Sequence, residues 1–357
     1  MDKRIREHAE IIAEWSTEME KDDKVVITTN PEAEELVIAL HEEIGKRGAH
    51  PITLYSSNEK SRSYLRNFDG EFKTPEHTLK LFEESDVFIS IRSDKNLKAL
   101  NDVPGELLSK YSKVRKPLSE IIQDKRTCLT VFPTNSLAQL AEMSLAEYQD
   151  FVWEAIIRDW QEIHDKQQIL KEKMDESDEV YIEGEETELT MSIKNNLGVN
   201  SDGKFNLPSG EVFTAPIPDS VEGEIYFDKP LIYMGREIKE VRLKFEEGEV
   251  VEYSAEMNEG LLDNLLKTDE GAKRLGELGI GTNRAIKKFT KNMLFDEKMG
   301  DTIHLALGRA INRSVGDDGK GNDSAIHMDI IKDMSEGRVE MDGETVMENG
   351  KFIWEID

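Results

Sequence analysis

The sequence predicts an α/β domain over residues 1–140 and an α+β domain over residues 141–357. In the first part, short apolar runs alternate four times with amphipathic stretches, which is typical of a mostly parallel sheet with flanking helices. In the second part, runs of alternating polarity lie between turn residues, which favours antiparallel strands mixed with a few helices. A chain of 357 residues is long enough for two domains that each bury an apolar core.

The first domain is expected to open with an amphipathic helix over residues 3–20, because apolar side chains recur there at roughly helical spacing. Residues 28–32 read Thr-Thr-Asn-Pro-Glu after the first expected strand, so no glycine-rich loop is present there to bind a dinucleotide. A nucleotide cofactor is therefore not expected. The remaining elements of this domain are strands at 24–29, 51–55, 86–91 and 127–132, and helices at 31–46, 78–84 and 105–123.

The second domain is expected to start with a long helix. Ser144 and Glu147 form a capping box, and the following residues contain neither Gly nor Pro up to about residue 173. Its aromatic and aliphatic stripe indicates packing rather than ligand binding. The Asp342-Gly343 and Asn349-Gly350 steps predict tight hairpin turns near the C-terminus. The other elements predicted are a hairpin over 180–193, strands at 231–233, 241–245 and 250–253, and helices at 258–266 and 270–275.

Composition excludes several classes of partner. The chain carries 74 acidic and 46 basic residues, a net charge of −28, so it would repel nucleic acid and anionic membranes. The single cysteine, Cys128, lies in an apolar run and is expected to be a buried small hydrophobe, which excludes an internal disulfide and a cysteine zinc site. The first residues lack the apolar core of a signal peptide, and no run of about 18 apolar residues occurs. We therefore expect a cytoplasmic protein.

Four motifs between residues 206 and 329 carry possible metal ligands. Glu211 and Glu277 each lie beside glycines and an apolar run, His304 lies within an apolar run, and His327-Met-Asp329 would place both polar side chains on one face of a strand. Each alone has a structural alternative, such as a strand-end carboxylate or a hydrogen-bonded His–Asp pair in the core. Together they form a donor set without thiolate that suits two divalent ions and a water activated between them.

The other five histidines lie in segments predicted to be ordinary helices, loops or surface. An imidazole in such a place is usually solvated or caps a helix. We therefore expect no ligand role for His8, His41, His50, His77 and His164.

The order of the motifs resembles the aminopeptidase T and aminopeptidase S family of dinuclear metallopeptidases. The resemblance covers nearly the whole chain. It is carried by the segments 136–148, 206–216 (Asn-Leu-Pro-Ser-Gly-Glu-Val-Phe-Thr-Ala-Pro), 276–283 (Gly-Glu-Leu-Gly-Ile-Gly-Thr-Asn), 294–308 and 324–329 (Ser-Ala-Ile-His-Met-Asp).

The resemblance implies that the α+β domain is catalytic and binds two divalent metal ions, either Zn, Co, Mn or Mg. The implied activity is release of N-terminal amino acids from short peptides by a homodimer that encloses its active site. Glu277 would also relay a proton to the leaving amine. Glu297 would be a further catalytic carboxylate that orients His304, with a surface ion pair near Lys298 as the alternative. The implied metal ligands are Glu211, Glu277, His304, His327 and Asp329.

The sequence departs from the family pattern after His304. The family has a tyrosine seven residues later, whose hydroxyl could stabilise an oxyanion, and this chain has Ile311 there. Loss of one such donor costs ~10²-fold in rate or more. Asn312 and Arg313 are the candidate replacements. The loop over 311–324 is also shorter than the family form and acidic, so a substrate preference does not transfer.

Two other functions remain open. A mononuclear Fe(II) ring-cleaving dioxygenase of the dihydroxypyridine type would use a triad of His304, His327 and Asp329. Glu211 and Glu277 would then be idle, which favours the peptidase. The second alternative is a metal-binding homologue with weak or lost peptidase activity, and Ile311 is its only support.

Overall fold

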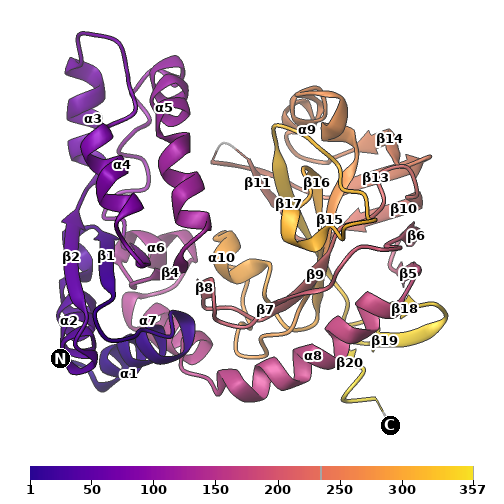
Figure 1. The fold of residues 1–357 in the computed structure, drawn as a ribbon. Coiled ribbons are helices and arrows are strands. Elements are labelled where there is room, and N and C mark those ends of the chain that lie inside the picture. Colours follow the sequence, from indigo (N-terminus) through magenta and orange to yellow (C-terminus); the bar gives the residue numbers. More distant parts are fainter. Residues whose placement is uncertain (234, 357) are drawn as a thin grey trace. The chain divides into compact units, whose positions relative to one another are not determined.

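The computed structural model describes residues 1–233 and 235–356. Two compact units make up the chain (Figure 1): one comprises Met1–Arg158 and Gly203–Pro208, the other Asp159–Asp202 and Ser209–Asp357. The predicted fold class is confirmed, since the first unit holds a parallel sheet with helices and the second holds antiparallel sheets. The first unit extends past the expected boundary at residue 140 and takes in a short segment from later in the chain.

The N-terminal unit is built on a five-stranded parallel sheet of order β2-β1-β3-β4-β8. Val26 and Phe88 face helices of one side and share a small core with Phe82 and Leu118. Their strand neighbours point to the opposite face and are buried as well, so helices cover both faces. The strands are β1 (Lys24–Thr29), β2 (His50–Tyr55), β3 (Val87–Arg92), β4 (Arg126–Val131) and β8 (Asn206–Leu207).

Two helices replace the single long helix predicted from residue 144. The prediction of one helix is wrong, because the chain leaves helical geometry at Ile157 and the Asp159 side chain accepts a hydrogen bond from Glu162 N to start the next helix. Ser144 does cap the first of the two, as expected. The helices are α1 (Lys3–Ile11), α2 (Glu34–Arg47), α3 (Asn58–Asn67), α4 (Glu76–Glu83), α5 (Gly105–Gln123), α6 (Asn135–Leu140), α7 (Leu145–Ile156) and α8 (Trp160–Glu176).

His8 is fully buried, so the expectation that it is solvated or a cap is wrong. The Thr130 hydroxyl donates to the backbone carbonyl of Leu207 at 2.7 Å, and His8 Nε2 lies 2.8 Å from the same hydroxyl oxygen. Because that hydroxyl proton is already used, Nε2 must be the donor to Thr130. Burial lowers the pKa of His8 to about 3, so this imidazole is neutral. Cys128 is buried, as predicted.

The C-terminal unit contains two larger antiparallel sheets that share one apolar core. Leu189 and Ile225 come from the eight-stranded sheet, Leu278 and Leu305 from the five-stranded sheet, and Leu170 from α8. The first sheet has the order β14-β13-β10-β6-β5-β18-β19-β20 and the second the order β17-β16-β15-β9-β7. A two-stranded ribbon of β11 and β12 is separate.

The predicted hairpin turns at Asp342-Gly343 and Asn349-Gly350 are confirmed, with positive φ at all four residues. The remaining helices are α9 (Glu259–Leu266) and α10 (Met293–Asp296). The strands of this unit are β5 (Glu179–Gly184), β6 (Thr187–Ser192), β7 (Val199–Ser201), β9 (Glu211–Thr214), β10 (Glu222–Phe227), β11 (Leu231–Tyr233), β12 (Arg236–Ile238), β13 (Val241–Glu246), β14 (Glu249–Ser254), β15 (Leu275–Gly281), β16 (Thr302–Gly308), β17 (His327–Asp333), β18 (Arg338–Met341), β19 (Glu344–Glu348) and β20 (Lys351–Phe352).

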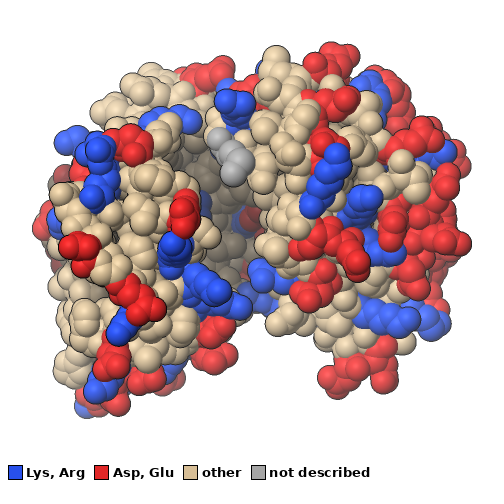
Figure 2. Space-filling view, turned by 90° about the horizontal axis from the view of Figure 1, so that it is seen from above, with Lys and Arg blue, Asp and Glu red and all other residues tan. Residues whose placement is uncertain are grey.

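The outward side of the eight-stranded sheet is strongly acidic. Exposed glutamates follow one another along β5, β6, β10, β13 and β14, and Figure 2 shows acidic side chains gathered over this part of the unit. Such a surface repels polyanions, in line with the charge of the whole chain. Among the described residues, no helix has the length and apolar character needed to cross a membrane.

Candidate metal centre

The five-stranded sheet of the C-terminal unit has one apolar and one polar face. Val212 on β9, Leu278 on β15 and Leu305 on β16 point into the shared core. Because side chains alternate along a strand, Glu211 and His304, which precede Val212 and Leu305, point to the opposite face. The same alternation on β15 and β17 places Glu277, His327 and Asp329 on that face. Local strand geometry therefore gathers the five predicted ligands on one surface.

Strand register then brings these residues side by side. Ala306 on β16 pairs with Glu277 on one neighbouring strand and with Asp329 on the other. His304 pairs with Gly279. A Cβ atom added at Gly279 would lie 2.1 Å from His304 Nε2, so the imidazole occupies the space that any other residue would fill. The absence of a side chain at Gly279 thus leaves room for the imidazole of His304.

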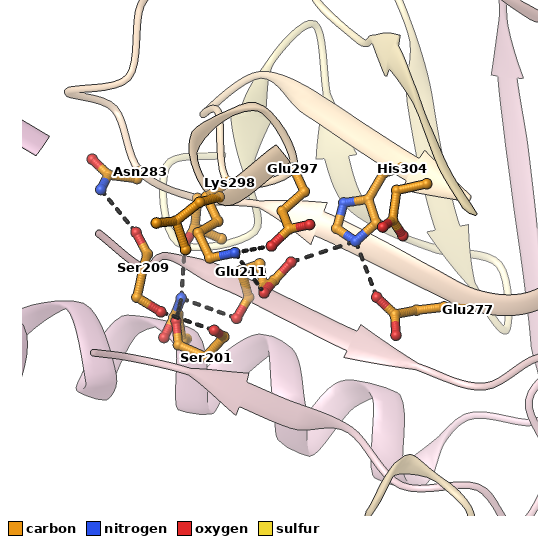
Figure 3. Close-up of polar contacts among 12 residues, drawn as sticks. Ser201, Ser209, Glu211, Glu277, Asn283, Glu297, Lys298 and His304 are labelled. Carbon is orange, nitrogen blue, oxygen red and sulfur yellow. Dashed lines mark hydrogen bonds and ion pairs between the residues drawn. The ribbon is translucent and has the colours of Figure 1, made fainter. Parts of the chain in front are cut away.

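The five side chains form two overlapping groups (Figure 3 shows the first). Glu211, Glu277 and His304 make one group, and Glu277, His327 and Asp329 make the other, with potential ligand atoms within 4.8 Å of one another in each. His304 Nε2 lies 3.2 Å from Glu277 Oε1 and 3.4 Å from Glu211 Oε2. His327 Nε2 lies 3.9 Å from Glu277 Oε2 and 3.4 Å from Asp329 Oδ1. Glu277 therefore turns one oxygen toward each group.

The orientation of His327 is set by a backbone contact. Its Nδ1 donates a hydrogen bond to the carbonyl oxygen of Arg309 at 2.6 Å. Since a carbonyl only accepts, Nδ1 carries the proton and Nε2 faces Glu277 and Asp329. Holding the outer nitrogen of an imidazole in this way is how proteins fix a histidine for metal binding. His327 therefore presents the correct nitrogen to the cluster.

Burial and neighbouring charges shift the pKa values of the side chains in this cluster. His304 is fully buried, and burial alone would lower its pKa, but the hydrogen bond that Nε2 donates to Glu277 and the charges of Glu211 and Asp329 raise the pKa to about 9. Burial also acts to lower the pKa of His327, but the hydrogen bond to Asp329 and the charge of Asp329 raise it to about 10. Burial raises the pKa of Glu277 in spite of His304. The protein thus holds protons on the imidazoles to balance buried carboxylates.

The donor set fits divalent cations. Three buried or nearly buried carboxylates and two imidazoles without a thiolate suit Zn²⁺, Mn²⁺, Co²⁺ or Mg²⁺. Buried carboxylates need cations, and besides the imidazolium groups and Lys298, which contacts Glu211, a metal ion can supply that charge here. The buried Nδ1 of His304 has no hydrogen-bond partner among the described residues. The polar face therefore holds two overlapping groups of residues that could bind divalent metal ions.

Comparison with known proteins identifies the family of the chain. The profile of the M29 peptidase family, described as thermophilic metalloprotease, matches residues 1–352. The chain belongs to the M29 family. Aminopeptidase T of Thermus thermophilus is 28% identical over 98% of this chain and 96% of its own length. Aminopeptidase 2 of Geobacillus stearothermophilus is 35% identical over 42% of this chain and 41% of its own.

The structure of wild-type AmpT from Thermus thermophilus superposes on this M29 chain with a TM-score of 0.85. The two share 26% sequence identity, and the match covers 98% of this chain and 99% of the other. The predicted family resemblance is thus confirmed, and so is the fold class of both units.

Glu297, predicted to orient His304, bonds instead to a lysine. Its Oε1 accepts a hydrogen bond from Lys298 Nζ, and among the described residues no hydrogen bond joins it to His304. The pair is buried and not at the surface, since Lys298 is 0% exposed. Burial raises the pKa of Glu297 to about 8, against the opposing charge of Lys298. The role of Glu297 in catalysis remains a prediction.

Ile311 brings no polar group toward the metal cluster, as the sequence indicated; its backbone carbonyl accepts a hydrogen bond from the Ser314 hydroxyl at 2.8 Å. Of the two replacement donors considered, Arg313 has a connection with the cluster. Arg313 is exposed as a residue, but partial desolvation of its guanidinium lowers its pKa, and the charges of Glu277 and Glu211 oppose that shift. Arg313 therefore lies within electrostatic reach of the M29 site.

Three supporting residues were not singled out from the sequence. Gly279 makes room for His304, Lys298 contacts Glu211, and the buried Gln167 on α8 donates to the backbone carbonyl of Glu211 at 3.2 Å and to Thr282 Oγ1 at 2.8 Å. Lys298 lies next to the predicted Glu297 and just before an apolar strand, which was a usable signal. Gln167 is one of several polar residues on its helix and gave no such signal.

Proposed function

We propose that this metal-dependent aminopeptidase releases the N-terminal residue of short peptides at a dinuclear centre formed by Glu211, Glu277, His304, His327 and Asp329. The observation that carries the proposal is the position of Glu277. Its two oxygens face His304 in one group and His327 in the other. A single-ion site would use only one of these groups and would give the second no part in the chemistry.

Bound divalent ions would polarise a peptide carbonyl and lower the pKa of a water to near neutrality. The chain's own residues supply the remaining chemistry. Glu277 is the candidate to relay the proton of the attacking water to the leaving amine, since it lies between the two groups of ligands. Arg313, whose pKa responds to the charges of Glu277 and Glu211, is the candidate to stabilise a developing oxyanion in place of the absent tyrosine.

The ring-cleaving dioxygenase is the weaker alternative. It needs His304, His327 and Asp329 around one iron and gives no role to Glu211. In the structure Glu211 Oε2 lies 3.4 Å from His304 Nε2, at the distance expected for two ligands of one ion. This proximity favours the dinuclear peptidase over the one-iron enzyme.

The decisive experiment removes metal with a chelator and restores Zn²⁺, Mn²⁺, Co²⁺ or Fe²⁺ separately. Bound metal is counted, hydrolysis of aminoacyl anilides is measured, and oxygen uptake is followed with dihydroxypyridines. We expect two ions per chain and anilide hydrolysis that falls by ~10²-fold or more in Glu211→Gln, because a metal ligand is lost. The control is Glu252→Gln, which changes an exposed glutamate on β14. One bound iron with oxygen uptake would refute the proposal.

A homodimer is a further part of this proposal and rests on the family resemblance, whereas a cytoplasmic location rests on the sequence alone. Sedimentation at micromolar concentration tests the dimer, which should have twice the 40.7 kDa mass of the chain. Hydrolysis of a series of peptides of increasing length tests the restriction to short substrates. Equal rates for short peptides and for a folded protein would contradict an enclosed site.

A further inference from the structure

A fully buried lysine lies against the candidate metal ligands. Lys298 is 0% exposed, and its Nζ lies 3.3 Å from Glu211 Oε1 and donates to Glu297 Oε1 (Figure 3). An ammonium group away from water is stable only when it is paired, and here it has two carboxylate partners. Ion pairing with both carboxylates favours the charged ammonium group. Lys298 is therefore a permanent cation at this position.

Lys298 divides the two oxygens of Glu211 between different partners. Oε1 faces Lys298 Nζ, whereas Oε2 faces His304 Nε2 at 3.4 Å. Only Oε2 belongs to the side of the carboxylate that points toward the cluster. A carboxylate held in this way offers one oxygen to an ion, although a free glutamate can bind through both.

The backbone holds Lys298 firmly in this place. Its N–H donates to the carbonyl of Phe295 at 3.0 Å, and its carbonyl accepts from the N–H of Asn283 at 3.0 Å. A Cβ atom added at Gly281 would lie 2.1 Å from the carbonyl oxygen of Met299, so residues 298–299 pack directly on that glycine. Gly281 is the strand partner of Glu211. The lysine and the glutamate are therefore fixed to the same point of the sheet.

We propose that Lys298 is a positioning residue that keeps Glu211 a one-oxygen ligand and so leaves a coordination position open for water or substrate. The inference rests on the proposed metal-dependent function. Without the ammonium, Glu211 is free to turn and to bind an ion through both oxygens. The extra oxygen would occupy the position that the reaction needs and would make the ion a weaker Lewis acid.

The test compares zinc-loaded wild type with Lys298→Met, which keeps the length of the side chain without its charge. We expect the variant to bind as many ions as wild type and to lose 10- to 100-fold in kcat, as is usual when a partner of a metal ligand is removed. Crystal structures of the loaded proteins should show both Glu211 oxygens at about 2.0–2.2 Å from one ion in the variant and one such oxygen in wild type. In a plot of kcat against pH, the fall of kcat on the acidic side should occur at a higher pH in Lys298→Met than in wild type.

Lys332→Met is the matched control, because Lys332 is the other buried lysine among the described residues of this unit. Its Nζ donates to the carbonyls of Tyr226 and Glu185, and its charged neighbours are not metal ligands. Both variants lose a buried ammonium, so both are expected to lose stability. Only Lys298→Met should change the coordination of Glu211 and the pH profile.

The double variant Lys298→Met/Glu297→Gln separates positioning from simple charge balance. It removes Lys298 together with the Glu297 carboxylate, which would otherwise be left without a cation. The double variant can therefore be tested even if Lys298→Met alone does not fold. Persistence of two-oxygen binding by Glu211 in the double variant supports positioning. If Glu211 in the double variant bound the ion through one oxygen and kcat returned to the wild-type value, the positioning role of Lys298 would be overturned. It would also be overturned if Glu211 still bound through one oxygen in Lys298→Met. An inactive zinc-loaded wild type would instead refute the proposed function.

Discussion

A methyl group added at Gly279 would collide with the imidazole of His304. The new Cβ would lie 2.1 Å from both Cε1 and Nε2 of that ring. Ordinary contact begins near 3.4 Å, so the ring has to move by about 1.3 Å, and a displacement of this size can reduce a rate by ~10²-fold. Because His304 also contacts Glu211 and Glu277, the movement would open the first ligand group.

The assay for Gly279→Ala combines a metal count with hydrolysis of an aminoacyl anilide at saturating Zn²⁺. We expect about 10²-fold lower kcat and weaker binding of one ion, as in the loss of other contacts that hold a ligand in place. Gly260→Ala is the control, since Gly260 lies on α9 of the same unit and has nothing within 4 Å of the new methyl group. If Gly279→Ala kept the kcat and the metal content of wild type, Gly279 would not be needed to make room for His304.

Two further predictions concern protons. The pKa of His8 is about 3 in the folded chain and 6.5 in the unfolded chain. As pH drops below 6.5, the unfolded chain binds a proton that the folded chain does not, so the free energy of unfolding falls. Between pH 6.5 and 5 this loss is about 2 kcal/mol. His8→Gln, which keeps a donor for Thr130, should remove this part of the acid sensitivity, as measured by urea unfolding with hydrogen exchange of α1 and β4 amides. Zinc must displace protons from His304 and His327, whose pKa values are about 9 and 10, so affinity should fall about tenfold or more from pH 8 to pH 7 in a chelator competition.

Either proton prediction can fail clearly. Equal acid sensitivity of wild type and His8→Gln would mean that other groups control the acid response of this unit. Zinc affinity that does not change between pH 8 and 7 would mean that the metal-free imidazoles are neutral. In the metal-free protein the sign of the stability effect is the reverse of that for His8. The pairing of His304 and His327 with carboxylates stabilises the fold below pH 6.5 and is lost as pH rises through about 9 to 10.

Sequence reasoning succeeded where the signal was local or ordered along the chain. Alternating apolar runs indicated β1 to β4 and their parallel sheet, and the Asp342-Gly343 step indicated a hairpin. It failed at the break between α7 and α8, because nothing but Asp159 interrupts the helical pattern there. It also misjudged His8, whose burial depends on contacts with Thr130, more than a hundred residues away in sequence.

The sequence by itself determined the family, the two-part architecture and the identity of the five candidate ligands, because these follow from residue types in a fixed order. The tertiary structure decided how those ligands are shared. Strand register sets Glu277 between two histidines, and Gly279 leaves the space that His304 occupies. The tertiary structure also pairs Glu297 with Lys298, which was the alternative left open, and brings that lysine against Glu211. Such relations depend on distances between strands that are far apart in the chain, and no local pattern encodes those distances.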